Sequence, residues 1–378
     1  MDQLAWDLGD PAGTMQLFDQ ACNGVLQPGS GQCRDFHPMK GPMLTQTLVG
    51  LSGEQPFHWR GDRATLGHFA GTTSVLRGAD AAFTAAQMQR LQAYLATISF
   101  PPNPNRNLDG SLRASVAGGS PVAGQTLYMT GNLAGGQCVT CHALPNGGGS
   151  SVISANLLLT TQDMNIPHLR NMHEKDGFDS ATSATNRRGF GFAHDGAHPT
   201  LIDFFRLPVF RFASGATGDQ QRRDVSAFVL SFENGTHASV GAQATLGGSA
   251  STGTARRSQL VTIANAGSAQ LIAKVVVSGV ERGYLYQSAT GSFLTDLSGQ
   301  TETLAGLEAL ADAGMAVTYT LLPNGTGRRA IDRDGDGVLD GDERGAGTNP
   351  DDPSSYPGAC PTGCENIFGD SFEPAQAP

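Results

Sequence analysis

The sequence predicts a multidomain α+β protein, in which mainly α domains are followed by a small β-rich domain and a C-terminal metal-binding loop. Three observations carry this prediction. Two stretches with apolar residues near the 3.6-residue helical period, 88–98 and 225–232, close two similar segments in the first part of the chain. A Gly/Ser/Ala/Thr-rich stretch, 238–254, then separates these segments from runs typical of strands. An acidic loop, 332–343, comes last.

Composition excludes some classes of protein. The chain has 378 residues, enough for several domains, with 50 Gly and 20 Pro, which favours short elements joined by loops. Its net charge of −10 argues against a nucleic-acid partner and gives no electrostatic reason to bind an anionic membrane. The longest apolar runs, such as 271–277, are too short to span a bilayer, so we expect no transmembrane segment.

The first 235 residues contain a gapped repeat. Segment 43–51 matches 164–172 in placement, 57–62 matches 192–196, and 65–69 matches 200–204. If the repeat is not a coincidence, residues 1–105 are a second copy of the domain that occupies residues 106–235. The copy at 1–105 then lacks its N-terminal part. The natural chain would then begin upstream of Met1.

The predicted domain boundaries follow from these changes in composition and apolar pattern along the chain. They are two related domains, a Gly/Ser-rich linker, a small β-rich domain, a metal-binding loop and a tail, at 1–105, 106–235, 236–255, 256–325, 326–357 and 358–378. In the β-rich domain, strands are expected at 260–263, 271–277, 284–286 and 317–322, with a helix at 304–313.

The most informative motif is Cys138-Val139-Thr140-Cys141-His142, a C-x-x-C-H sequence. This is the attachment signature of a c-type haem: each thiol can add across a haem vinyl group, and His142 is placed to ligate the iron. A redox disulfide or half of a zinc site are the alternatives. Zinc would require a second Cys pair at suitable spacing, and the other close pair, Cys360 and Cys364, lies far downstream.

Cysteine use also predicts the compartment. Cys22 with Cys33, and Cys360 with Cys364, are plausible local disulfides, which form in oxidising surroundings. Covalent haem attachment in bacteria also takes place outside the cytoplasm, so a periplasmic, extracellular or cell-surface location is expected. The start of the sequence has no basic region followed by an apolar one, so we expect the export signal to lie upstream of Met1.

The acidic loop 332–343 satisfies the pattern D-x-D-x-D-G-x5-E. Ca²⁺ requires six to eight oxygen ligands, at roughly 2.4 Å, and this spacing supplies them from one loop. The expected ligands are the carboxylates of Asp332, Asp334 and Asp336, the carbonyl of Val338, a water held by Asp340, and both oxygens of Glu343. An acidic solvated turn is the alternative. No flanking helix is expected, which favours a structural extracellular site over a sensor.

Residues for the open face of the haem are harder to assign. Met164, Met172 and His194 could each approach the iron, although Met164 could instead be a hydrophobic anchor and His194 could instead form a hydrogen bond near the haem. If none of them binds the iron, the iron is five-coordinate and could bind peroxide. Arg170 could pair with a haem propionate or could pack between domains.

Three motifs together resemble a known family. Cys138 to His142, then Ile166-Pro167-His168-Leu169-Arg170-Asn171, then Gly191-Phe192-Ala193-His194-Asp195-Gly196, are similar to segments of the bacterial di-haem cytochrome c peroxidase superfamily. Within it, the chain looks closest to large exported proteins whose cytochrome domains follow a β-propeller. The stretch 347–353 resembles dockerin and thrombospondin type 3 calcium loops. The resemblance implies cytochrome c-like domains and a second haem c in the full-length protein.

One departure from this family bears on activity. The resemblance implies a Met ligand shortly before the closing helix, but residues 201–218 contain several Phe and no Met. We therefore expect an exported c-type cytochrome that exchanges electrons with a redox partner protein or a small-molecule electron donor or acceptor, and that carries structural Ca²⁺. The alternatives are a di-haem peroxidase-like oxidoreductase that reduces hydrogen peroxide, and a calcium-dependent cell-surface binding protein.

Overall fold

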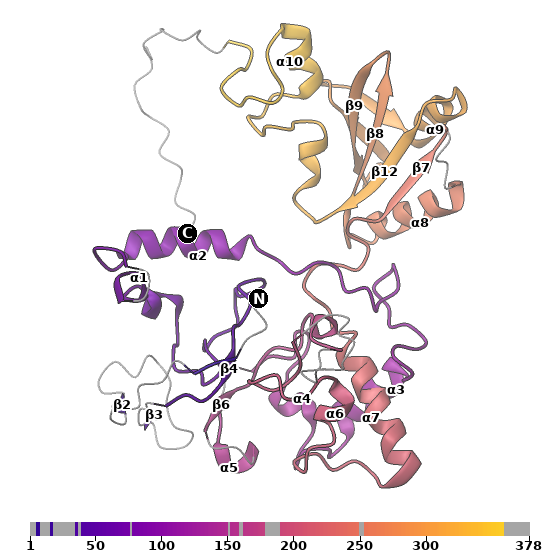
Figure 1. The fold of residues 1–378 in the computed structure, drawn as a ribbon. Helices are drawn as coiled ribbons and strands as arrows, with labels where there is room; N and C mark the ends of the chain where they lie inside the picture. The colour runs from indigo at the N-terminus through magenta and orange to yellow at the C-terminus, as the bar shows by residue number, and fades with distance from the viewer. Residues whose placement is uncertain are drawn as a thin grey trace, which may run out of the picture. The chain divides into compact units, whose positions relative to one another are not determined.

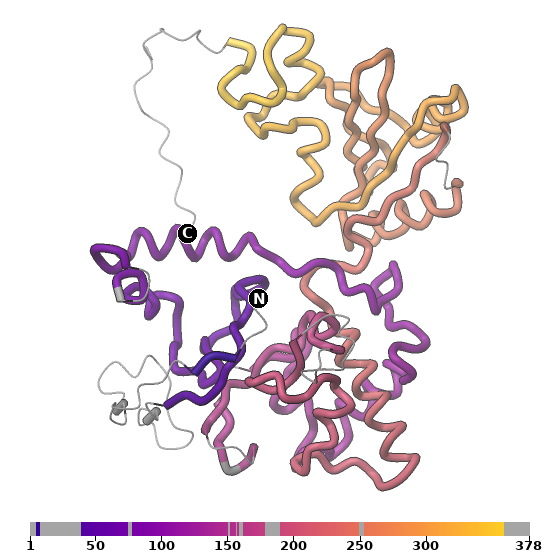
Figure 2. Tube along the Cα trace, viewed as in Figure 1, coloured from indigo at the N-terminus to yellow at the C-terminus, as the bar shows by residue number. Residues whose placement is uncertain are grey.

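The chain forms two compact units, Met1–Ala238 and Ser239–Pro378, in a computed structural model (Figure 1). The structure describes residues 5–7, 16–17, 35–36, 39–75, 78–149, 152–158, 162–177, 190–248 and 253–358, and Figure 2 follows their Cα trace. The predicted disulfides of Cys22 with Cys33 and of Cys360 with Cys364, and most of the predicted tail, lie outside these residues. Each unit is described by itself.

The first half of the first unit contains short elements. Strand β1 pairs with β4, strand β2 pairs with β3, and three helical segments follow. Their bounds are β1 Ala5–Trp6, β2 Gln16–Leu17, β3 Asp35–Phe36, β4 Met43–Leu44, η2 Leu66–Phe69, α1 Thr72–Val75 and α2 Ala85–Ala96. Helix α2 begins with a capping box, in which the Thr84 and Gln87 side chains bond each other's backbone N–H groups.

The second half of this unit has two longer helices that pack together. The elements are α3 Pro121–Thr130, α4 Cys138–Cys141, β5 Val152–Ile153, α5 Ala155–Leu158, β6 Met164–Asn165, η3 Met172–Glu174, α6 Leu201–Phe204 and α7 Gly215–Val229. Helix α3 approaches α7 so closely that a Cβ on Gly124 would lie 1.9 Å from the backbone oxygen of Asp224. Only glycine fits there, and Tyr128 then packs its ring 5.2 Å from that of Phe228.

The two halves share local geometry at the positions that the repeat aligns. Phe57 forms an isolated β-bridge to Arg63, and Phe192 forms one to His198. The residue after each Phe has a positive φ, 68° for both His58 and Ala193. The short helices η2 and α6 then follow at matching positions.

The halves also exchange equivalent hydrogen bonds. The Leu44 N–H in β4 donates to the carbonyl oxygen of His194 at 2.8 Å, and the Asn165 N–H in β6 donates to that of Trp59 at 2.7 Å. The strand of each half thus bonds the loop of the other half. Equivalent positions of two copies of one motif would form reciprocal bonds of this kind. This reciprocity supports the repeat, while the boundary between residues 105 and 106 stays a prediction.

The second unit is built on a six-stranded antiparallel sheet with the order β11-β10-β9-β8-β12-β7. Its elements are β7 Gln243–Leu246, α8 Thr254–Asn265, β8 Gln270–Val277, β9 Val280–Gln287, β10 Ser292–Thr295, β11 Thr301–Thr303, α9 Leu304–Asp312, β12 Val317–Leu322, η4 Gly327–Ala330 and α10 Asp340–Ala346. Strands β7 and β8, which helix α8 connects, lie on either side of β12.

Both faces of this sheet are covered in part. The alternating residues Val317, Tyr319 and Leu321 of β12 are fully buried, and helices α8 and α9 contact this strand. The opposite face carries a second apolar cluster of Ile272, Leu285, Ala330 and Ile331, with Leu322 and Leu339 packed against it. The acidic loop is therefore attached to the sheet through Ile331, which precedes it, and Leu339, which lies within it.

The predicted fold class is wrong in its balance of helix and strand. Helices make up 30% and strands 17% of the structure, and the six-stranded sheet means that the chain is not built from mainly α cytochrome-like domains. Four of the seven helices described in the first unit have only four residues, because Gly and Pro interrupt the chain often. Strand β7 also lies within 236–255, where composition predicted a linker.

Of the five elements predicted for the β-rich domain, four are right and one is wrong, and strands β10 and β11 were not predicted. Strands β8, β9 and β12 and helix α9 are confirmed. The run 260–263 was predicted as a strand but belongs to α8, because Leu260, Ile263 and Ala264 form one buried helical stripe. A four-residue apolar run does not distinguish a strand from a buried helix turn. Among the described residues, no helix is long and apolar enough to cross a membrane, as the sequence predicted.

Candidate functional site

The C-x-x-C-H motif forms a single helical turn in the second half of the first unit. Gln137 is the N-cap of α4, and the N–H of His142 donates to the carbonyl oxygen of Cys138 at 2.8 Å, which closes the turn. Within the described part of the chain, Cys138 and Cys141 are both free thiols and both partly buried. Burial raises the pKa of the Cys138 thiol. Two free thiols on one turn meet the requirement for two thioether bonds to one haem.

The imidazole of His142 is held in one orientation. Its Nδ1 lies 2.7 Å from the carbonyl oxygen of Gly147 and 3.1 Å from that of Pro167. A carbonyl only accepts, so Nδ1 carries the hydrogen and Nε2 keeps the lone pair that a metal needs. Burial lowers the pKa of His142, against the opposing effect of the two carbonyls. The ring is therefore neutral at pH 7 and suited to bind iron through Nε2.

Tyr128 supports the same turn and was not singled out from the sequence. Its hydroxyl donates to the carbonyl oxygen of His142, while its ring is 1% exposed in the core. Desolvation raises the pKa of this phenol, so it stays protonated and remains a donor. Helix α3 contributes only one large aromatic residue, and its distance of fourteen residues from His142 is too long to be recognised as a motif.

The turn borders an apolar cluster that offers surface for a flat macrocycle. Cys138 and Val139 pack against buried residues of this cluster, and its partly buried members include three phenylalanines, Phe204, Phe210 and Phe212. The ring centroids of Phe205 and Phe210 lie 5.2 Å apart. This set fits a haem, because the group requires an apolar pocket beside its thiol and imidazole partners.

The structure separates the three candidates for the open face. Met172 is 6% exposed and belongs to the cluster that Cys138 contacts. Met164 is buried in β6, opposite Ile153 of β5, and is not a member of that cluster. His194 is half-buried, and its backbone carbonyl accepts the bond from Leu44. The identity of the sixth ligand stays a prediction, and Met172 is the candidate that shares a cluster with Cys138.

Arg170 connects the two halves of the unit. Its Nη2 lies 2.8 Å from Glu54 Oε1 and 2.6 Å from the carbonyl oxygen of Gly50, and its guanidinium stacks over the Phe100 ring at 5.2 Å. These contacts match the domain-packing role that the sequence left open beside the propionate role.

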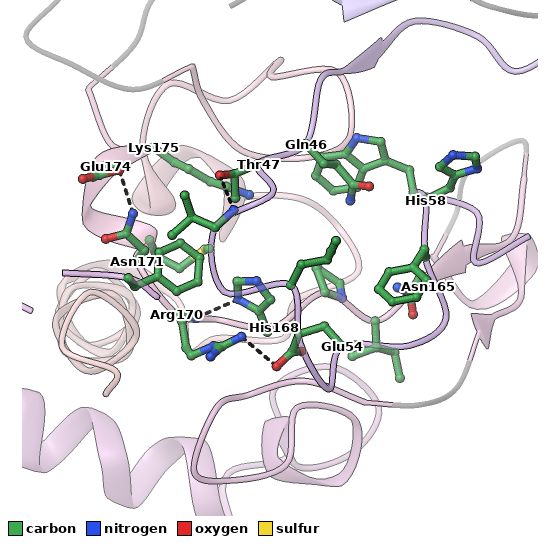
Figure 3. A pocket seen from close by; sticks show the side chains of 18 of the residues that line it. Gln46, Thr47, Glu54, His58, Asn165, His168, Arg170, Asn171, Glu174 and Lys175 are labelled. Carbon is green, nitrogen blue, oxygen red and sulfur yellow. Dashed lines mark hydrogen bonds and ion pairs between the residues drawn. The ribbon is translucent and has the colours of Figure 1, made fainter. Parts of the chain in front are cut away.

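A cavity of about 300 Å³ lies at the junction of the two halves. Its walls include residues from 45–51 and from 166–172, the two segments that the repeat aligns. Figure 3 shows Glu54, His168, Arg170 and Lys175 around it. Cys138, Cys141 and His142 are not among its lining residues. Sequence reasoning missed this cavity, because it forms between segments far apart in the sequence, of which the motif 166–171 is one.

The acidic loop of the second unit has the turn geometry that its spacing predicts. The Asp332 carboxylate accepts from the Gly335 N–H at 2.9 Å, and the Asp336 carboxylate accepts from the Val338 N–H at 2.8 Å. Gly337 has φ 101°, a conformation that favours glycine. These turns bring side-chain oxygens toward the inside of the loop.

The loop has the properties of a cation site. Carboxylate oxygens of Asp332, Asp334 and Asp336 lie within 4.8 Å of one another. One buried oxygen each of Asp334, Asp336 and Glu343 has no hydrogen-bond partner, although Glu343 is completely buried. Burial and the neighbouring carboxylates raise the pKa of Glu343. Unpartnered buried oxygens that converge in this way fit a hard cation such as Ca²⁺.

Two details of the loop differ from the sequence analysis. The expectation that no helix flanks it is wrong, because α10 begins at Asp340 and η4 ends at Ala330. Asp340 is 2% exposed, and its carboxylate accepts from the N–H and Nε of Arg333 at 2.8 and 2.7 Å. The predicted water-mediated role of Asp340 and the carbonyl role of Val338 stay predictions.

The chain was compared with known protein families, with curated proteins and with solved structures. None of them matches it. The resemblance to di-haem cytochromes therefore rests on its short motifs alone.

Proposed function

We propose that this chain is a c-type cytochrome that binds haem covalently through Cys138 and Cys141, with His142 as the proximal iron ligand, and transfers electrons. The observation that carries the proposal is the pairing of two free thiols on one turn with an imidazole whose Nδ1 is fixed by two carbonyls. A bound haem supplies the one-electron chemistry.

The residues around the turn would set the properties of that haem. Hydrogen bonds from Nδ1 to Gly147 and Pro167 increase the donor strength of Nε2, which favours oxidised iron. The phenylalanine-rich cluster excludes water, which favours the less charged, reduced state. The balance of these two effects determines the potential, and the partner is proposed to be a redox protein or a small-molecule electron donor or acceptor.

The proposal for the second unit is a structural Ca²⁺ ion in loop 332–343. Its support is the set of unpartnered buried oxygens of Asp334, Asp336 and Glu343. Since Ile331 and Leu339 attach the loop to the sheet, an ion there would stabilise the whole unit. Covalent haem and Ca²⁺ together fit a periplasmic, extracellular or cell-surface location.

Production of the chain with a haem c maturation system tests the first proposal. The haem is expected to stay with the wild-type chain after acid–acetone extraction, and to be lost from Cys138→Ala/Cys141→Ala. Ferrous protein that is low-spin and unreactive to carbon monoxide and peroxide would support an electron carrier. A high-spin, peroxide-reactive iron would support the peroxidase-like alternative instead.

A further inference from the structure

The cavity at the junction of the two halves has an amphipathic lining. Its apolar wall comes from both halves and includes Trp59, Phe100, Ile166 and Met172. Its volume of about 300 Å³ is at the lower end of the range for sites that bind small molecules. A space of this size is uncommon, because protein interiors are otherwise close-packed.

Lys175 is the cation that faces this space without a carboxylate partner among the described residues. Its Nζ lies 5.4 Å from the ring centroid of Trp59 and 5.4 Å from that of Phe190. Both rings offer only their negative faces. Burial lowers the pKa of Lys175 to about 8, with no carboxylate among the causes. The ammonium is therefore still charged at pH 7, and no carboxylate neutralises its charge.

The carboxylates that line the cavity are already engaged. Glu54 accepts from Arg170 at 2.8 Å, and Glu174 accepts from the Asn171 amide at 2.6 Å (Figure 3). Glu54 also accepts from the Asn146 amide at 2.8 Å. The polar groups of the lining that are still available therefore include hydrogen-bond donors. His168 Nδ1 accepts from the Arg170 N–H at 3.2 Å, so its Nε2 carries the hydrogen.

We propose that this cavity binds a small organic acid, with its carboxylate on Lys175 Nζ and its apolar body against Trp59 and Phe100. The apolar wall selects against inorganic anions, which would lose their hydration without gaining contacts. The ammonium selects against neutral molecules of the same shape. An aromatic carboxylate satisfies both conditions. Cys138, Cys141 and His142 do not line this site, although Met172, a candidate for the open face of the haem, does.

Calorimetric titration of the full chain with benzoate tests the proposal. Saturable binding with one site per chain is expected, and benzamide, the neutral analogue of the same shape, is expected to bind roughly 10- to 100-fold more weakly. Lys175→Met should weaken benzoate to the same extent and leave benzamide unchanged. The matched control is Lys274→Met, which removes a half-exposed lysine of the second unit and should have no effect.

A second variant keeps the proposal testable if Lys175→Met does not fold. Val49 also lines the cavity, so Val49→Trp places a large ring in it and should abolish benzoate binding with Lys175 intact. Absence of benzoate binding to the wild-type chain would overturn the proposal. Binding that benzamide matches, or that survives both variants, would equally overturn it.

Discussion

Removal of one loop carboxylate should abolish the stabilisation of the second unit by calcium. Asp334 contributes a buried oxygen without a hydrogen-bond partner, and its carboxylate lies within 4.8 Å of those of Asp332 and Asp336. Without a cation these groups and the buried Glu343 repel one another, so an ion that binds only the folded loop stabilises the unit. Asp334→Asn removes one ligand charge and retains the shape of the side chain.

The expected size follows from linkage between binding and folding. For the modest affinity of extracellular calcium modules, about 10⁻⁴ to 10⁻³ M, about 10 mM Ca²⁺ should raise the free energy of unfolding by about 1.4–2.7 kcal/mol. For a unit of this length, that corresponds to a rise in Tm of about 5–10 °C. Differential scanning calorimetry in Ca²⁺ and in a chelator measures it directly.

The matched control is Asp312→Asn, which neutralises an exposed carboxylate at the end of α9. This variant should keep the full calcium-dependent rise in Tm, whereas Asp334→Asn should lose most of it. Mg²⁺ should substitute poorly, because it requires a smaller octahedral site and releases its waters reluctantly. The reasoning would be refuted by equal Tm values in Ca²⁺ and chelator, or by an Asp334→Asn variant that responds as the wild type does.

Two further predictions concern packing and pH. Gly283→Ala would place a Cβ 1.6 Å from the carbonyl oxygen of Ala330. Urea unfolding should therefore show that the free energy of unfolding of the second unit falls by about 2–3 kcal/mol. The control Gly345→Ala, whose Cβ would meet no atom within 4 Å, should be neutral or stabilising. Burial lowers the pKa of His168 to about 3, so the unfolded chain takes up a proton first as the pH falls. Stability of the first unit should be intact above pH ~6.5 and about 2 kcal/mol lower at pH ~5. His168→Gln should reduce this loss of stability, whereas the exposed control His68→Gln should not. An equal loss in the wild type and both variants would contradict the assignment of the loss to His168.

Local motifs were the most predictable part of this chain from its sequence. The turn of Cys138 to His142 and the loop 332–343 are defined by spacing along a few residues, so their conformations follow from the sequence. Strand β8 was predictable from its long apolar run 271–277 and strand β12 from its alternating apolar residues, whereas β9 was predicted from the three residues 284–286 alone. Tertiary packing was needed to decide the run 260–263, which is a helix because its buried residues share one stripe against the sheet.

Contacts between distant segments could not be derived from the sequence. The bonds of Nδ1 of His142 to Gly147 and Pro167 depend on how two loops fold over one ring. The pairing of Arg170 with Glu54 joins residues more than a hundred positions apart, so the sequence left its role open. The reciprocal bonds between the two halves show how a gapped repeat that is weak in sequence is still expressed in backbone geometry.

The content of covalently bound haem per chain tests the central claim most directly. The chain contains one C-x-x-C-H motif, so after maturation and denaturing extraction the pyridine haemochrome assay should find one haem c per chain. His142→Ala should lose the proximal ligand and change the ferrous spectrum, while both thioether bonds can still form. Wild-type protein from which all haem is extracted would contradict the account.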